Sequence, residues 1–335
     1  MENVYIIAEA GVNHNGDISM ALELVKKAKW AGADCVKFQT FKAESIVTRS
    51  SPKASYQLKV TDNKESQFEM LKALELNLSD YEILKKECDK LGIDFMSTPY
   101  DYDDVDFLND LGIDTFKIAS SQLTEIPFLE YVAKKKKRVI LSTGMATLAE
   151  VFDATQAVKA YNQDLIVLQC TTNYPSLIKE SNINAMLSIE KACGVKIGYS
   201  DHVQNNYACY SAVSLGAKVI EKHFTLDKSL PGPDHSCSLI PEEFKEMIYG
   251  IRQIEKSLGN GIKTPTVNEM DNIFAMRRSI VASKNLKKGD QIEVKSIAFK
   301  RPFSGLAPKE LKNILGKKLN KNISIDSRIQ FNDFE

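Results

Sequence analysis

Short apolar runs alternate with amphipathic stretches along most of the chain. The runs are rich in β-branched and aromatic residues and end at Gly, Pro, Asp or Ser, which is typical of buried parallel strands. They lie at 4–11, 35–40, 94–99, 115–120, 139–144, 165–171, 196–202 and 219–226. The stretches between them carry apolar residues at helical spacing, and a last helix is expected at 241–259, with Pro241 at its start and Gly259 at its end.

This repeat predicts the fold class. Eight strand–helix units in about 260 residues match the size of a (β/α)8 TIM barrel. The competing fold, a doubly wound open sheet, normally has fewer strands and a glycine-rich loop after the first one. The first turn here reads EAGVNHNGD and contains no GxGxxG. We therefore predict an α/β TIM barrel as the catalytic domain, over residues 1–260.

The pattern changes after Gly259. Residues 261–277 are mostly polar and predict a linker. Residues 278–335 contain three short β-like runs, RSIVAS, KSIAFKRP and RIQFND, which predict a small, mainly-β domain. A domain of about sixty residues is marginally stable alone, so we expect it to pack on the barrel or on a neighbouring subunit.

One connection inside the barrel is unusually long. Some forty residues separate the second strand from the helix expected at 79–91. Such long connections are usually functional, and a βα connection lies on the catalytic face of a TIM barrel. We expect it to form part of the site.

Composition excludes several classes of protein. The 335 residues carry 44 basic and 44 acidic side chains, whereas nucleic-acid binders normally have a basic surplus. The apolar runs fall short of the roughly 20 residues that a membrane span needs, and the first residues lack the positive charge of a signal peptide. The six cysteines are scattered, without CxxC, as is typical of reduced, buried thiols. We expect a cytoplasmic protein that binds neither nucleic acid nor membrane.

The four histidines fall at strand ends or in adjacent loops, as His14, His202, His223 and His235. His202 and His223 end neighbouring strands, which lie about 4.8 Å apart in a sheet. Two imidazoles at that spacing could share a divalent metal ion and leave positions open for substrate and water. The alternative is that each is a structural, hydrogen-bonded histidine, and the pairing favours the metal.

Small hydroxyls and lysines also recur at strand ends. The pairs 97–98, 120–121 and 142–143 supply hydroxyls and backbone amides suited to phosphate oxygens. Lys37 and Lys117 lie inside apolar runs, and a lysine is almost never buried unless it is paired. A substrate carboxylate or phosphate is the expected partner; a Schiff-base role and an outward-facing lysine are the alternatives.

Carboxylates lie at the same end of the strands. Glu9 ends the first run, and Asp201 and Asp234 are candidates for a metal's outer shell or for acid–base chemistry. Glu221 is a further candidate on this face, and an outward orientation, ion-paired near Lys222, is the alternative.

The motifs EAGVNHNG, VKFQTFK, STPYD, KIASS, LSTGM, YSDH, EKHFTLD and PGPDH, in this order, resemble the sialic acid synthase family, which includes N-acetylneuraminate, legionaminate and pseudaminate synthases. KRPFSGL resembles that family's antifreeze-like (SAF) domain. The resemblance implies an enzyme that condenses phosphoenolpyruvate with an N-acetylmannosamine-type sugar and water. The products would be a nine-carbon 2-keto sugar acid and phosphate.

The resemblance also implies roles for single residues. His202 and His223 would bind the metal, expected to be Mn²⁺, with Mg²⁺ or Co²⁺ as alternatives. Phosphoenolpyruvate would contact Lys37, Thr98, Lys117, Ser120, Ser142 and Ser200. The sugar would contact Glu9, Gln39, Tyr174, Asp234 and Arg301, the arginine reaching the partner's barrel in a domain-swapped homodimer. The catalytic set would be Glu9, Lys117, Gln122, His202, His223 and Asp234.

Gln122 departs from the family pattern, because many members have a glutamate there. An amide cannot act as a general base. The base is therefore expected at Glu9, Asp234 or a metal-bound water, or else the sugar differs and Gln122 recognises a diacetamido-trideoxy precursor of legionaminic acid. Two other functions stay open at this point: a Schiff-base aldolase that uses Lys117 or Lys37, and a sugar-binding barrel without catalysis.

Overall fold

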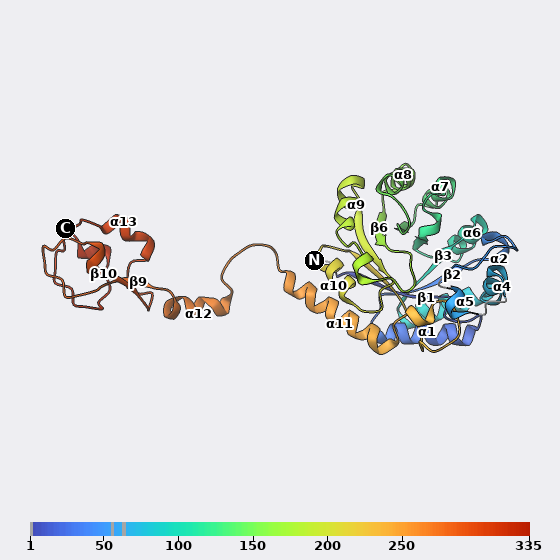
Figure 1. The fold of residues 1–335 in the computed structure, drawn as a ribbon, viewed down its shortest axis with the longest axis horizontal. Helices are drawn as coiled ribbons and strands as arrows, with labels where there is room; N and C mark the ends of the chain where they lie inside the picture. Colours follow the sequence, from blue (N-terminus) through green and yellow to red (C-terminus); the bar gives the residue numbers. More distant parts are fainter. Residues whose placement is uncertain (1–2, 55–56, 62–64) are drawn as a thin grey trace. The chain divides into compact units, whose positions relative to one another are not determined.

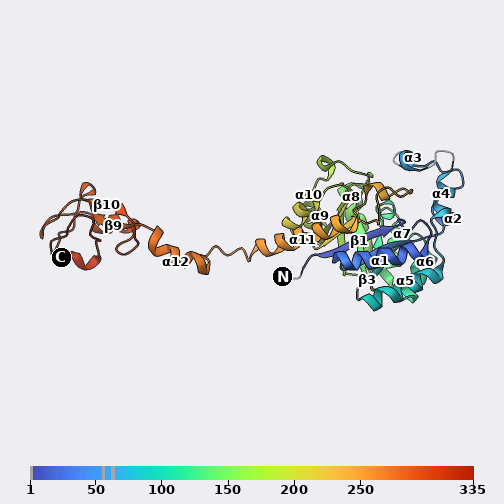
Figure 2. The same cartoon turned by 90° about the horizontal axis from the view of Figure 1, so that it is seen from below.

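The computed structural model describes residues 3–54, 57–61 and 65–335. The chain forms two compact units, Met1–Gly259 and Asn260–Glu335, and each is described by itself. Figures 1 and 2 show the helices and strands of both units in sequence colours.

The first unit is built on eight parallel strands. They are β1 (Tyr5–Gly11), β2 (Cys35–Thr40), β3 (Asp94–Pro99), β4 (Thr115–Ile118), β5 (Arg138–Ser142), β6 (Leu165–Cys170), β7 (Lys196–Asp201) and β8 (Val219–His223). Their order in the sheet is β3-β2-β1-β8-β7-β6-β5-β4, and the end strands β3 and β4 also pack together. The sheet is therefore a nearly closed barrel, which confirms the predicted fold.

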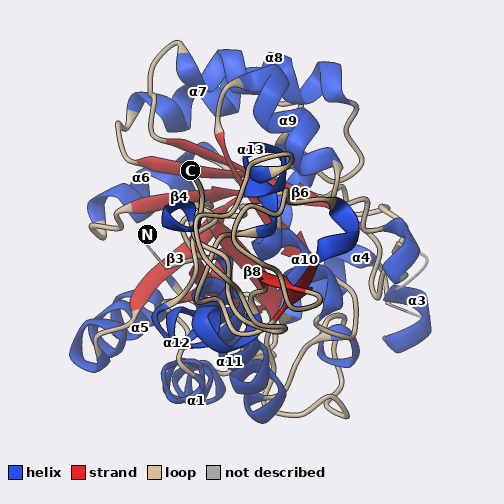
Figure 3. Ribbon diagram, turned by 90° about the vertical axis from the view of Figure 1, so that its left-hand side faces the viewer, coloured by secondary structure: helices blue, strands red, loops and turns tan. Residues whose placement is uncertain are grey.

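Helices follow the strands and surround them, as Figure 3 shows in blue around red. They are α1 (Ile18–Ala31), α5 (Leu78–Leu91), α6 (Tyr102–Asp110), α7 (Ile126–Lys134), α8 (Leu148–Lys159), α9 (Ala185–Cys193), α10 (Tyr207–Ser214) and α11 (Pro241–Leu258). Local sequence sets their ends. In α1, the Asp17 carboxylate accepts a hydrogen bond from the Ser19 amide, and Gly32 closes the helix at φ 95°.

Side chains alternate between the two faces of each strand, and this alternation produces two apolar layers, one outside and one inside the barrel. Outward residues such as Ile6, Val36 and Phe38 belong to the large core under the helices. Inward residues near the beginnings of the strands form a smaller cluster inside the barrel: Ile7, Cys35, Met96, Ile140, Ile166, Leu168 and Val219. Because side chains alternate along a strand, the residues two positions further on face the same interior, nearer the C-terminal end.

The long connection after β2 is not structureless. It contains three short helices, α2 (Ala43–Ile46), α3 (Gln57–Val60) and α4 (Gln67–Ala73). Helix α4 begins with a capping box, in which the side chains of Ser66 and Glu69 each accept a hydrogen bond from the other residue's backbone amide. Residues 55–56 and 62–64 of this connection lie outside the described residues.

The second unit begins with helix α12 (Val267–Met276), which occupies most of the range predicted as a linker. Strands β9 (Ser279–Ala282) and β10 (Ile297–Lys300) pair antiparallel, and α13 (Leu311–Ile314) packs on their cluster. The predicted third run is not a strand: Arg328 makes one bridge to Val281. The Asp333 carboxylate then accepts from the Gln330 amide, which closes a turn, and Phe334 bridges Leu319 after it.

Single-turn 3-10 helices complete the secondary structure: η1 (Ser120–Gln122), η2 (Ile178–Glu180), η3 (His235–Cys237), η4 (Val294–Ser296), η5 (Pro308–Glu310) and η6 (Phe331–Asp333). Among the helices of the described ranges, none is both long and apolar enough to cross a membrane. All six cysteines are free and buried, as predicted for reduced thiols; the cellular compartment stays a prediction.

Candidate active site

A cavity of about 440 Å³ lies at the C-terminal ends of the barrel strands. Every strand or the loop directly after it contributes to the wall. The predicted site residues that line it are Glu9, Lys37, Gln39, Thr98, Lys117, Ser120, Ser142, Tyr174, Ser200, His202, His223 and Asp234. The barrel therefore gathers into one cavity residues that lie up to 225 positions apart in sequence (234 − 9).

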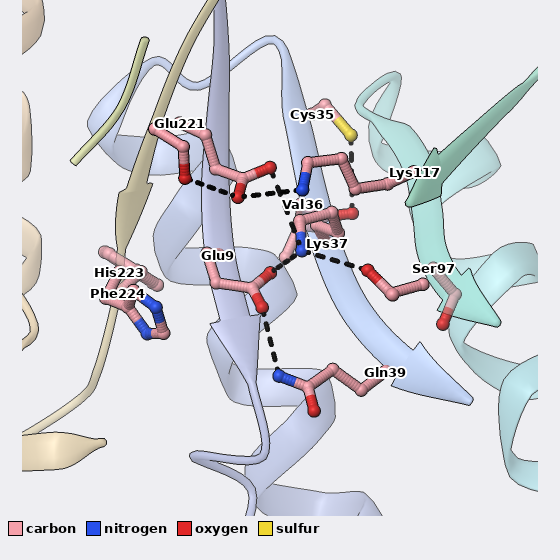
Figure 4. A network of polar contacts seen from close by, with 12 residues as sticks. Glu9, Cys35, Val36, Lys37, Gln39, Ser97, Lys117, Glu221, His223 and Phe224 are labelled. Atoms are coloured by element: carbon pink, nitrogen blue, oxygen red, sulfur yellow. Dashed lines mark hydrogen bonds and ion pairs between the residues drawn. The ribbon is translucent and has the colours of Figure 1, made fainter. Parts of the chain in front are cut away.

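A cluster of two lysines and two glutamates forms the floor of this cavity, and Figure 4 shows the four side chains facing one another. The Lys37 Nζ lies 2.7 Å from a Glu9 carboxylate oxygen and 3.8 Å from Glu221. The Lys117 Nζ lies 3.5 Å from Glu221. All four side chains are less than a tenth exposed, so each charge depends on the others for compensation.

Mutual compensation shifts the pKa values within the cluster. Burial opposes charge on Lys37, but Glu221 and Glu9 outweigh it and raise the lysine's pKa. Burial lowers the pKa of Lys117, and the positive charge of Lys37 lowers it further, against the pull of Glu221. Burial raises the pKa of Glu9 despite Lys37, whereas Lys117 and Lys37 together overcome burial and lower the pKa of Glu221. The floor therefore holds two ammonium groups that an incoming anion could share.

Hydroxyl groups surround the lysines. Lys37 donates to the Thr98 hydroxyl at 3.2 Å, and the Ser200 hydroxyl donates to Glu221 at 3.0 Å. The Ser142 hydroxyl is buried and makes no hydrogen bond to the described residues. The Ser120 hydroxyl accepts from the amide of Gly144, where an added Cβ would lie 1.9 Å from a threonine hydroxyl. Unused capacity of this kind suits the oxygens of a phosphate.

The two histidines at the ends of β7 and β8 lie side by side, with ring centroids 5.1 Å apart and ring planes tilted by 56°. The His202 Nδ1 lies 2.7 Å from the Thr171 carbonyl oxygen, which fixes this nitrogen as the donor and leaves Nε2 as an acceptor. The His223 Nδ1 is buried without a hydrogen-bond partner in the described part of the chain. Burial opposes charge on His202, but the neighbouring Cys170 thiol outweighs it and raises the pKa of His202 to about 8, whereas burial lowers the pKa of His223. With both rings deprotonated, their free nitrogens would fit a divalent ion of the Mn²⁺, Co²⁺ or Zn²⁺ type.

The remaining metal ligands would not come from a preformed protein cluster. The described residues contain no group of three or more His, Cys, Asp or Glu side chains arranged around one ion. An Asp234 carboxylate oxygen lies 3.9 Å from the His223 Nδ1. Two imidazoles would therefore hold the ion and leave its other positions to substrate and water.

The other two histidines are structural. The His235 Nδ1 lies 2.7 Å from the Thr225 hydroxyl, and its Nε2 lies 3.1 Å from the Asn15 amide oxygen. The His14 Nδ1 accepts from the Gly16 amide at 3.0 Å. Neither residue lines the cavity, so only half of the strand-end histidines face the site.

The long connection after β2 contributes both apolar and amide side chains to the cavity wall. The apolar ones are Ile46, Met70, Leu71 and Leu74, next to Val12, and the amides are Gln57 and Gln67. The apolar residues form a small cluster of their own, apart from the barrel core. The connection therefore lines the site, as predicted, and adds an apolar patch to its wall.

Two predicted residues lie outside the cavity wall. Gln122 follows Ser120 and Ser121 in the turn η1, is 3% exposed, and has both amide atoms without a hydrogen bond to the described residues. Arg301 belongs to the second unit, where it is exposed. The roles expected of both stay predictions.

The structure separates two carboxylates that the sequence placed on one face. Glu221 points into the cavity floor, and not outward as in the alternative, because it lies two positions before His223 and so shares that residue's face of β8. Asp201, taken as a site carboxylate, points outward and pairs with Lys222 at 2.5 Å. Both orientations could have been predicted by counting the alternation of side chains along each strand from His202 and His223. Tyr100, which lines the cavity and lies 3.4 Å from the Gln39 amide oxygen, was missed altogether.

Comparison with known proteins agrees with this geometry. Residues 24–263 match the model of the NeuB family, and residues 277–335 match the SAF domain. The chain is 45% identical to N,N'-diacetyllegionaminic acid synthase of Campylobacter jejuni over 98% of this chain and 100% of the relative. It is 37% identical to pseudaminic acid synthase of the same organism, over 100% of this chain and 97% of that one.

A solved structure shares the fold as well. The N-acetylneuraminic acid synthetase of Leptospira borgpetersenii, in complex with citrate, matches with a TM-score of 0.72 and 33% identity, over 81% of this chain and 90% of that one. Fold, cavity chemistry and sequence thus point the same way. The chain belongs to the NeuB family of phosphoenolpyruvate-condensing nonulosonic acid synthases and carries a C-terminal SAF domain.

Proposed function

We propose that this synthase condenses phosphoenolpyruvate with a diacetamido-trideoxy hexose and water, to give a legionaminic-acid-type product and phosphate. One observation carries the choice of sugar: the cavity wall includes an apolar patch from Ile46, Met70 and Leu71, beside the amides of Gln57 and Gln67. A sugar that lacks a hydroxyl and bears two acetyl methyl groups loses less hydration against such a wall than N-acetylmannosamine does. The higher identity to the legionaminic than to the pseudaminic relative supports the same choice.

In this proposal the charged floor binds phosphoenolpyruvate. The ammonium groups of Lys37 and Lys117 face the anion, and the hydroxyls of Thr98, Ser120, Ser142 and Ser200 complete its hydrogen bonds. Without substrate, the two lysines are neutralised by Glu9 and Glu221. Binding a trianion therefore redistributes these pairs, which favours proton uptake by a glutamate whose pKa is already raised, and that is Glu9.

The sugar lies above the floor, beside Gln39, Tyr174 and Asp234. The Tyr174 ring packs 4.1 Å from that of His202, which orients the imidazole. A divalent ion held by His202 and His223 would supply Lewis-acid polarisation of the open-chain aldehyde. The C3 atom of phosphoenolpyruvate forms the new carbon–carbon bond to the aldehyde carbon, and the aldehyde oxygen takes up a proton to become a hydroxyl.

Water then adds to C2 and loses one proton, which leaves a hydroxyl on that carbon. When the carbon–oxygen bond to phosphate breaks, this hydroxyl gives its proton to the departing phosphate and becomes the ketone. We assign the proton acceptor to Asp234. Burial, and next the negative charge of Glu9, raise the pKa of Asp234 to about 6, which is close to the range a general base needs. Gln122 has no titratable group and therefore cannot be the proton acceptor.

The test is phosphate release on mixing the full-length enzyme with phosphoenolpyruvate, Mn²⁺ and one sugar at a time. We expect turnover with the diacetamido-trideoxy hexose, at least tenfold lower kcat/KM with N-acetylmannosamine, and loss of both on adding EDTA. Turnover of N-acetylmannosamine alone would refute the assigned sugar. Absence of phosphate release with every sugar would leave a sugar-binding barrel instead.

A Schiff-base aldolase is the second candidate, because the lowered pKa of Lys117 is what an iminium-forming lysine needs. Its Nζ also donates to the Ile118 carbonyl oxygen at 3.2 Å and faces Glu221, contacts that suit an anion-binding cation. Borohydride reduction in the presence of pyruvate, followed by mass spectrometry, separates the two roles. We expect no adduct on Lys117.

A further inference from the structure

A second charged cluster lies directly behind the two histidines. In the pairing of β7 with β8, Ser200 is opposite Glu221 and Asp201 is opposite Lys222. The next residue along each strand is a histidine, His202 or His223. Since Glu221 and His223 face the cavity (Figure 4), the residue between them faces the helices. Each imidazole is thus the sequence neighbour of one member of an outward ion pair.

This ion pair is completely buried and completely hydrogen-bonded. The Lys222 Nζ lies 2.5 Å from an Asp201 oxygen, and both side chains are 0% exposed. The same Nζ donates to the carbonyl oxygens of Val203 and, at 2.9 Å, of Asn205, so all three ammonium protons are used.

Asp201 is equally saturated. One carboxylate oxygen accepts from the Tyr199 hydroxyl and from the Val203 amide, both at 3.0 Å. The other accepts from the Cys209 thiol at 3.2 Å as well as from Lys222. The network therefore ties together β7, β8, the start of α10 and the loop 203–206 that leaves His202.

Such a network adds little to the free energy of unfolding, but it fixes the relative positions of the segments that it joins. A buried ion pair gains little over apolar packing of the same shape, because both charges lose their water, whereas its hydrogen bonds tolerate few arrangements. Here the fixed elements are the two strand ends that carry the imidazoles and the backbone that follows His202. Their spacing determines whether one ion can contact both rings.

We propose that Asp201 and Lys222 are positioning residues, which hold the imidazoles of His202 and His223 at the separation required to bind one divalent ion. The inference rests on the metal role given to the histidines in the proposed function. It adds an outer pair of residues whose effect on metal binding passes through the backbone of β7 and β8, without contact to metal or substrate.

The test is the affinity of the full-length, metal-free protein for Mn²⁺, measured by isothermal titration calorimetry. We expect the double variant D201N/K222M to bind Mn²⁺ about 10- to 100-fold more weakly than the natural chain, the range found when residues that orient metal ligands are removed. D201E keeps both charges of the ion pair but lengthens the acidic side chain by one methylene group. It is expected to stay folded and to show a smaller loss of affinity.

A matched control comes from an ion pair at the opposite end of the barrel, where Arg252 lies 3.2 Å from Asp34. D34N/R252M should lower the melting temperature and leave the Mn²⁺ affinity unchanged. The proposal would be overturned if folded D201E or folded D201N/K222M bound Mn²⁺ as tightly as the natural chain. If the double variant does not fold, the Mn²⁺ affinity of D201E is the deciding measurement. If H202A leaves Mn²⁺ binding intact, the metal role in the proposed function fails first.

Discussion

Strand β8 carries two buried lysine–carboxylate clusters that differ in how far their hydrogen bonds are satisfied. The outer cluster, Asp201 with Lys222, uses all three ammonium protons and both carboxylate oxygens within the protein. The inner cluster, in which Glu221 serves both Lys37 and Lys117, opens onto a cavity of about 440 Å³. Beside it, the Ser142 hydroxyl has no partner among the described residues.

The difference shows that burial of charge does not by itself mark a binding site. Both clusters are buried, and the sequence placed the carboxylates of both, Asp201 and Glu221, on the same face. The outer cluster has no hydrogen-bonding capacity left for a ligand, whereas the inner one has cations and hydroxyls with capacity to spare. Spare capacity beside a cavity is the better sign of substrate binding.

The sharpest way to break this comparison is to remove the lysine of each cluster. K222M should lower the free energy of unfolding by about 3–5 kcal/mol, because Asp201 is left charged and buried. K37M should cost less stability, since Glu9 and Glu221 can take up a proton or water from the cavity, but it should lower kcat/KM by about 100- to 1,000-fold. Urea unfolding and phosphate release measure the two effects. Equal stability losses would contradict the distinction.

The second prediction concerns the proton acceptor on the cavity side. A base acts only when deprotonated, and the pKa of Asp234 lies at about 6. We therefore expect kcat/KM to rise about tenfold per pH unit below that value and to level off above it. D234N should remove this acid limb together with most of the activity, while D104N, which alters a buried aspartate in helix α6, should keep the limb. An unchanged limb in D234N would assign it to another group.

The smallest expected effect is at Gln122, which is buried like the outer cluster but unsatisfied like the inner one. If its amide recognises the sugar, Q122E should shift the ratio of kcat/KM values toward N-acetylmannosamine by about tenfold, because a carboxylate accepts hydrogen bonds from hydroxyls but donates none. Q122A should lower both values without preference. An unchanged ratio in Q122E would make Gln122 a structural residue.

Much of the fold could be read from the chain because its signals are local. The spacing of apolar runs reflects the two periodicities of strand and helix, and eight repeats require a closed barrel for their edges to be covered. The run at 328–333 was predicted wrongly because a strand needs several consecutive paired residues as well as a pattern. Here Arg328 makes a single bridge, and the chain turns at Gln330–Asp333 before Phe334 bridges Leu319. In the long connection after β2, short helices with local caps were overlooked because they are less than two turns long.

The site could be predicted only as far as residue type allows. The amino-acid sequence by itself determined that lysines, hydroxyls and two histidines end the strands of a barrel, since strand ends are set by local pattern. Tertiary structure decided which of them face one another. It turned Glu221 inward and Asp201 outward, and it brought apolar residues of α2 and α4 into the wall of the same cavity. The physical reason is that closing a barrel fixes the pleat of every strand, and one position along a strand separates the cavity from the core.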